Sequence, residues 1–160
     1  AKLNFDDLHT EKPTVPPNQS EEIIIKEEYI TYILNELGAY ELHNPPLSSN
    51  KPNIKFYVEE DIFTSEVVNN NIQTKKGDIG QEDLKFITTK KVVIELINSE
   101  NIAEKFKKSI NEGVSSYEIV SDKKTLFLKG YLSLYKKITG EEISITGEII
   151  NLFTPEDKDF

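Results

Sequence analysis

The sequence predicts an α+β fold, with an antiparallel sheet of about five or six strands and helices packed on one face. Two patterns carry this prediction. Short segments of alternating apolar and polar residues are separated by only a few polar residues, which favours hairpins over the long crossovers that parallel strands need. Other segments repeat their apolar residues at helical spacing and begin or end at capping residues.

The first helix is expected from about Ile30, because apolar residues recur at the i, i+3, i+4, i+7 positions up to Leu37. Gly38 follows, where a left-handed cap belongs. Thr88 or Thr89 can cap a second helix. Asn101 can cap a third helix, which is expected to end at Gly113.

The middle of the chain predicts a meander of short strands. The segments are 54–58, 63–68, 72–75 and 84–88, and a further strand is expected around Tyr117 and Ile119. Asp122-Lys123-Lys124 is interpreted as a turn. Residues 125–140 show both the alternation of a strand, at Leu126 and Leu128, and the apolar spacing of a helix, and a helix is favoured from at least Tyr131. Residues 143–153 place isoleucines on odd positions and predict a closing strand.

The length of 160 residues fits one domain with tails, since a single core commonly organises about 100 to 200 residues. Residues 1–20 contain three prolines and no sustained period, which predicts a disordered or linker arm. The α+β domain is placed at 21–154 and a tail at 155–160.

The chain begins at Ala1 and contains no Met. Together with the proline-rich arm, this leads to the hypothesis of an extracytoplasmic domain whose N-terminal membrane anchor lies upstream. Within the given sequence the longest apolar run, at 23–25, is far shorter than the roughly 20 residues of a membrane span. Asn18-Gln19-Ser20 is either an N-glycosylation acceptor or a turn.

No catalytic residue, cofactor or metal ligand is assigned from the sequence. The absence of Cys excludes disulfides and thiolate ligands, and His9 and His43 have no second ligand at metal-binding spacing. Hydrolase, nucleotide-binding and metalloprotease patterns are missing. Whether the protein is an enzyme stays open, with the balance against it, because paired carboxylates need only meet in space.

The net charge of −9 opposes binding to a nucleic-acid backbone. Charge is unevenly distributed, because residues 85–140 hold eleven Lys and six acids, whereas the rest of the chain holds eight Lys and twenty-two acids. Lys107, Lys108, Lys136 and Lys137 are therefore candidates to face an anionic membrane surface. The alternative is that these lysines only form the solvent-exposed faces of their helices and keep the protein soluble.

The predicted order of elements resembles that of the sterol-carrier-protein type of lipid-binding domain over about residues 54–140. The similarity lies in residues 83–97, where a strand leads into a capped helix, in residues 102–113, and in residues 126–135, where Lys129-Gly130 precedes the last helix. The chain departs from the family in the strand expected at 143–153 and in polar residues around 109–114.

The resemblance implies a non-enzymatic carrier of lipid or another hydrophobic small molecule, in an acidic protein with a hydrophobic cavity, tethered near a membrane. The implied lining residues are Ile102, Phe106, Ile110, Leu126, Leu132 and Tyr135. The alternative is a secreted or surface subunit that binds other proteins through a strand edge or its N-terminal arm, with residues 21–26 as an added strand. The oligomeric state is left open.

Overall fold

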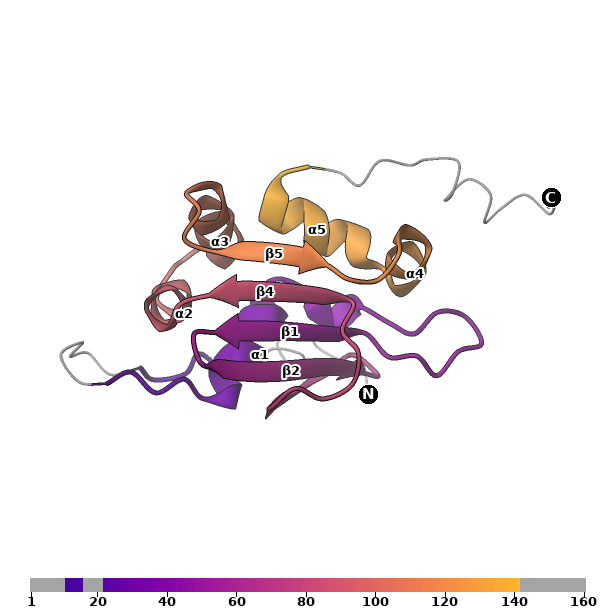
Figure 1. Cartoon of the computed structure of the whole chain (residues 1–160), viewed down its shortest axis with the longest axis horizontal. Helices are drawn as coiled ribbons and strands as arrows, with labels where there is room; N and C mark the ends of the chain where they lie inside the picture. Colours follow the sequence, from indigo (N-terminus) through magenta and orange to yellow (C-terminus); the bar gives the residue numbers. More distant parts are fainter. Residues whose placement is uncertain (1–10, 16–21, 142–160) are drawn as a thin grey trace.

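A five-stranded sheet forms one layer of the protein, in the strand order β3-β2-β1-β4-β5 (Figure 1). The computed structural model describes residues 11–15 and 22–141. The strands are β1 (Asn53–Val58), β2 (Asp61–Val68), β3 (Asn71–Lys76), β4 (Leu84–Thr88) and β5 (Ser116–Ile119). The strands predicted between residues 54 and 119 are all present, and the one predicted at 143–153 lies outside the described residues.

The prediction of a purely antiparallel sheet is wrong for one pair of strands. β1 and β4 are parallel, with Phe56 opposite Phe86, while β1–β2, β2–β3 and β4–β5 are antiparallel. The β2–β3 hairpin is inserted between β1 and β4, so their connection is long enough for a parallel crossover. The short spacing from β3 to β4 was misleading, because these two strands are neighbours in the sequence but not in the sheet.

The helices are α1 (Glu27–Glu36), α2 (Lys90–Ile97), α3 (Ile102–Asn111), α4 (Lys123–Lys129) and α5 (Tyr131–Thr139), with a 3₁₀ turn, η2 (Ala39–Glu41). The predicted caps are confirmed. The Thr89 side chain accepts a hydrogen bond from the Val92 amide at 3.1 Å, and Asn101 accepts one from Glu104 at 3.1 Å. Gly38, after α1, has a left-handed φ of 82°.

The segment after β5 differs from its prediction. Asp122 is the N-cap of α4, accepting a hydrogen bond from the Thr125 amide at 2.8 Å, so the expected turn is the start of a helix. α4 and α5 are separated by Gly130, whose φ of 89° breaks one helix into two. The strand-like alternation of Leu126 and Leu128 therefore belongs to a helix.

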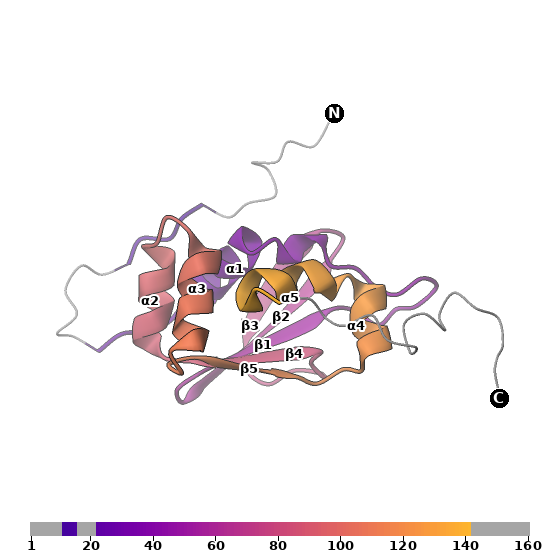
Figure 2. The same ribbon diagram turned by 90° about the horizontal axis from the view of Figure 1, so that it is seen from above.

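The helices cover one face of the sheet, as predicted (Figure 2). The core between the layers contains three phenylalanines: Phe56 on β1, Phe86 on β4 and Phe106 on α3. Their ring centroids lie 5.0 to 6.1 Å apart, and all three side chains are fully buried. Close packing of this kind leaves no open space among these three rings.

The prediction of a linker arm over 1–20 concerns residues that are largely outside the described ranges. Residues 11–15 are described, and Pro13 is buried while Val15 packs against the core. Just before α1, Ile25 is buried and Ile23 packs against the same core. Two of the three isoleucines in the segment proposed as an added strand therefore serve their own domain, which counts against that role.

Candidate functional site

The six residues predicted to line a lipid cavity come from three helices. Ile102, Phe106 and Ile110 lie on α3, Leu126 on α4, and Leu132 and Tyr135 on α5. Ile102, Phe106 and Leu126 are buried, and the other three are half-buried. Phe106 packs into the phenylalanine cluster of the core, so it is engaged with the protein's own side chains.

A small gap between the sheet edge and the C-terminal helices brings two of the predicted residues together. Leu126 and Tyr135 line it with Tyr131, and Leu84 and Ile119 complete it from β4 and β5. Its volume is about 10 Å³, smaller than one water's share of liquid volume. Sequence reasoning did not predict Leu84 and Ile119 as lining residues, because only the pairing of β4 with β5 places them opposite α4 and α5.

Two tyrosines lie at the side of this gap. The Tyr117 and Tyr135 hydroxyls are 3.3 Å apart, and their rings meet edge to face with centroids 5.9 Å apart. The hydrogen bond with Tyr135, followed by burial, raises the pKa of Tyr117 to about 12. The contact between the two tyrosines joins β5 to α5.

A buried polar cluster adjoins the gap; we call it the Asp83 cluster, and its members are Asn53, Asp83, Ser121, Lys129 and Tyr131. The Asp83 carboxylate accepts hydrogen bonds from the Asn53 amide at 2.9 Å, Ser121 Oγ at 2.6 Å and Tyr131 Oη at 2.8 Å. Lys129 Nζ lies 2.8 and 3.0 Å from its two oxygens. The cluster therefore joins β1, β4, α4 and α5.

Lys129 extends the Asp83 cluster to the loop before β1. Its ammonium also donates to Asn50 Oδ1 at 3.0 Å and to the Lys51 carbonyl at 2.9 Å. Burial, and then the charge of Asp83, raise the pKa of Tyr131 well above its ordinary value. The carboxylate is buried and its oxygens are occupied by donors, so the arrangement is built for structural linkage rather than acid-base exchange with a substrate.

A second buried lysine lies on the uncovered face of the sheet. Lys55 Nζ binds Asp78, the Gly80 carbonyl and Glu82, the last at 3.3 Å, all from the link between β3 and β4. Burial alone lowers the pKa of Lys55, but the hydrogen bonds and charges of Asp78 and Glu82 outweigh it and raise that pKa. This link closes over Lys55.

The predicted membrane-facing lysines have different surroundings. Lys107 forms an ion pair with Glu104 at 3.2 Å, and Lys137 donates to the Leu37 carbonyl at the end of α1 at 3.1 Å. Lys108 and Lys136 are exposed. At least Lys107, Lys136 and Lys137 therefore interact with other groups of the domain.

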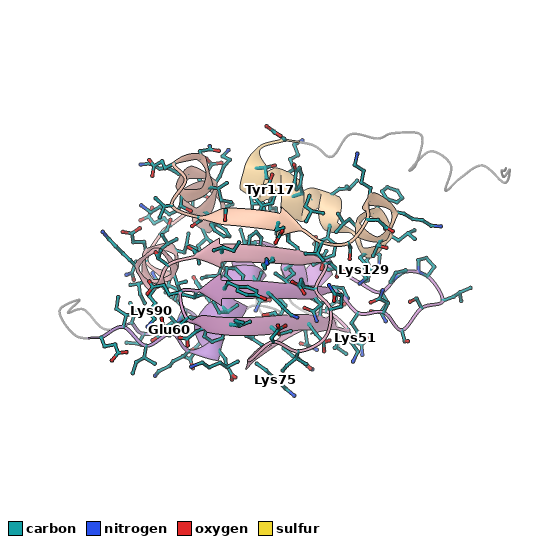
Figure 3. All side chains as sticks on the ribbon, viewed as in Figure 1. Lys51, Glu60, Lys75, Lys90, Tyr117 and Lys129 are labelled. Carbon is teal, nitrogen blue, oxygen red and sulfur yellow. The ribbon has the colours of Figure 1, made fainter. Side chains whose placement is uncertain are left out.

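The acidic turn 59–61 joins β1 to β2 and also contacts α2. Glu59 accepts a hydrogen bond from the Lys90 amide at 2.9 Å, and Glu60 pairs with Lys90 Nζ at 2.8 Å (Figure 3). The hydrogen bond from Lys90 lowers the pKa of Glu60. His43 is exposed in a loop, as expected, and His9 lies outside the described residues.

Metal and membrane features were sought in residues 11–15 and 22–141. No group of three or more His, Asp or Glu side chains there is arranged to hold a metal ion. None of the helices in the same ranges is long and apolar enough to cross a bilayer.

Comparisons with known proteins give similarities of arrangement only. The sequence matches no protein-family model and no curated protein. Among solved structures, "UbiJ-SCP2 Ubiquinone synthesis protein" is similar over 68% of this chain and 90% of that chain, with 13% identity and a TM-score of 0.40. The inverting sec-alkylsulfatase Pisa1 from Pseudomonas sp. is similar over 60% of this chain, with 15% identity and a TM-score of 0.36.

The sterol-carrier-protein likeness predicted from the sequence is thus found among the matched structures. Identity of 13% with a TM-score of 0.40 carries no ligand, activity or residue role to this chain. The chain spans only 13% of the length of the sulfatase.

Proposed function

We propose that this chain is a non-enzymatic binding domain for a hydrophobic small molecule such as a lipid. The observation that supports this proposal is the apolar gap between the β4–β5 edge and helices α4 and α5. Leu126 and Tyr135, two of the residues expected to line a cavity, face Leu84 and Ile119 across it. A ligand there would gain about 25 cal/mol for each Å² of apolar surface removed from water.

The gap must widen to admit such a ligand, because about 10 Å³ holds no acyl chain. Tyr135, which is half-buried, and Ile119, which is exposed, lie on its solvent side, so movement of their side chains is the smallest change that enlarges it. The more deeply placed Ile102 and Phe106 would then line only the far end of an expanded site. Ile110 and Leu132 remain proposed lining residues on α3 and α5.

An anionic lipid surface is the proposed place of loading. Lys108 and Lys136 are exposed on α3 and α5, which pack against each other. Each Lys near an anionic membrane contributes about 1 kcal/mol of attraction. Co-sedimentation with phosphatidylserine vesicles, compared with uncharged phosphatidylcholine vesicles, checks this part of the proposal; equal sedimentation with both would contradict it.

Binding of a dansylated undecanoic acid, followed by fluorescence, tests the site. Ile119→Ser is expected to weaken binding about fivefold to tenfold, because one buried aliphatic contact is lost. Ile87→Ser is the matched control: Ile87 is 41% exposed and Ile119 40%, but Ile87 lies on the opposite face of the sheet. Binding should be unchanged in this control.

Two results would overturn the proposal. One is the absence of any binding by the original protein, together with the absence of a co-purifying lipid in native mass spectrometry. The other is equal weakening by Ile119→Ser and Ile87→Ser, since the apolar gap would then play no specific part.

A second candidate function is protein binding through the outer edge of β5. Val114, Ile119 and Val120 are exposed on or beside this strand, which is at the edge of the sheet in the described residues. Exposed edge strands with apolar side chains are templates for an added strand. A concentration-dependent dimer that Val120→Lys dissolves would favour this candidate, and a monomer at all concentrations would count against self-association.

A further inference from the structure

A surface pocket of about 340 Å³ lies at the end of the sheet marked by the β2–β3 turn, away from the apolar gap. We call it the Lys51 pocket. Its lining includes Leu42, His43, Lys51, Val67, Asn69 and Asn70. This volume falls at the lower end of the range of about 300 to 1,000 Å³ that is typical of small-molecule sites.

Hydrogen bonds fix the walls of the pocket relative to one another. The Lys51 carbonyl is held by Lys129 Nζ at 2.9 Å, and the His43 amide donates to the Lys129 carbonyl at 3.1 Å. The third wall is the β2–β3 turn, where Asn70 Nδ2 donates to the Tyr40 carbonyl at 3.0 Å. The Asp83 cluster therefore holds two walls through Lys129, and the pocket is preorganised before any ligand arrives.

The pocket is basic in an acidic protein. The chain carries 28 acids against 19 Lys, but no carboxylate side chain of the described residues lines this pocket, whereas Lys51 and His43 do. The Lys51 side chain is exposed, and within the described ranges its ammonium has no ion pair or hydrogen bond. Its backbone carbonyl is held by Lys129, so the point from which the Lys51 side chain starts is fixed at the pocket wall (Figure 3).

Polar and apolar groups share the rest of the lining. Asn69 and Asn70 contribute amides from the turn, and buried Leu42 and Val67 contribute aliphatic surface. A lone ammonium next to amide groups favours an anionic head, while the aliphatic surface favours a short hydrocarbon portion. Inorganic anions would use only the first of these features.

We infer that the Lys51 pocket binds a small organic anion, whose carboxylate or phosphate pairs with the Lys51 ammonium and whose short apolar portion lies against Leu42 and Val67. This site is separate from the apolar gap. It is built from the loop before β1, the segment after η2 and the β2–β3 turn, whereas the gap lies among β4, β5, α4 and α5.

The test is a titration of the ¹⁵N-labelled full chain with hexanoate, followed by amide NMR. Shifts are expected at His43, Lys51, Asn69 and Asn70. Lys51→Gln should weaken hexanoate binding about tenfold, because one charge-assisted contact is lost. Within the described residues the Lys51 side chain makes no hydrogen bond or ion pair, so this variant should fold; Lys75→Gln, which removes an exposed lysine from β3, is the control and should bind normally.

Hexanol and inorganic phosphate serve as the two partial ligands. Weaker binding of both than of hexanoate supports the inference, since each lacks one half of the expected chemistry. Hexanol binding as tightly as hexanoate, or equal binding by the Lys51→Gln and Lys75→Gln variants, overturns the role of the charge. Phosphate binding as tightly as hexanoate overturns the apolar part, and shifts confined to Ile119 and Tyr135 would place hexanoate in the apolar gap instead.

Discussion

Lys55 and Lys129 are buried to the same extent, with side chains 1% exposed, but their partners differ. Lys55 lies under the link between β3 and β4, and its partner Asp78 is 56% exposed. Lys129 lies between the C-terminal helices and the loop before β1, and its partner Asp83 is 3% exposed. Lys55 thus has one partner that stays in water, besides Glu82, which is 12% exposed, whereas both charges of the Lys129–Asp83 pair are removed from water.

This difference determines what each lysine contributes to stability. A buried charge is costly unless it is paired, and removing one partner of a fully buried pair leaves the other uncompensated. Removing Lys55 would leave Asp78 in contact with solvent. Removing Lys129 would leave Asp83 buried with three neutral donors and no cation.

The largest effect is expected from Lys129→Met. This variant should lose about 3 to 5 kcal/mol of unfolding free energy, because Asp83 keeps its charge but loses its counter-ion. Urea unfolding followed by circular dichroism measures the change. The double variant Asp83→Asn with Lys129→Met should recover part of the loss, since no buried charge remains.

A loss of less than about 1 kcal/mol in Lys129→Met would break the comparison. It would mean that water reaches Asp83 in the variant. The same measurement on the double variant separates this result from a general packing defect, because packing loss alone would not be reversed by Asp83→Asn.

An intermediate effect is expected from Lys55→Met, at about 1 to 2 kcal/mol. The Gly80 carbonyl loses a donor, and the charge attraction to Glu82 is lost, but Asp78 stays solvated. Lys75→Met, an exposed neighbour on the same sheet, is the control and should change stability by no more than about 0.5 kcal/mol. If Lys55→Met proves as costly as Lys129→Met, partner exposure is not what separates the two lysines.

The smallest effect is expected from alkaline pH. The pKa values of Lys55, Tyr117 and Tyr131 are raised in the folded protein, so the folded state holds these protons more tightly than the unfolded chain. Their contribution is therefore complete below about pH 10, the ordinary range of Tyr and Lys, and is lost as the pH rises toward the folded pKa values.

Unfolding midpoints in urea at pH 8, 9, 10 and 11 measure this loss, which should stay below about 1 kcal/mol up to pH 10. Absorbance at 295 nm should show Tyr131 ionising only as the protein unfolds. Tyr131→Phe removes that late ionisation and serves as the control. A free energy of unfolding that stays constant through pH 11 would contradict the raised pKa values.

Local signals predicted most of the elements. Thr89 and Asn101 cap helices as expected, and Gly38 takes the left-handed conformation that ends a helix. These features depend on hydrogen bonds and backbone conformations among residues a few positions apart, so the sequence carries them directly. The segment 125–140 was ambiguous because the periods of a strand and of a helix both occur in it; in the structure α5 packs on α3, and α4 packs on α5.

By itself, the sequence therefore determined the α+β class, the helices α1, α2, α3 and α5, the strand segments, and the caps at Gly38, Thr89 and Asn101, but not helix α4. Only the tertiary structure decided that β4 pairs in parallel with β1 and that Lys55 and Lys129, among the lysines of residues 11–15 and 22–141, are buried. It also placed Lys51 in a pocket without acids. Strand order and burial arise from contacts between distant segments, and a lysine's own neighbours in the chain do not show whether another segment will close over it.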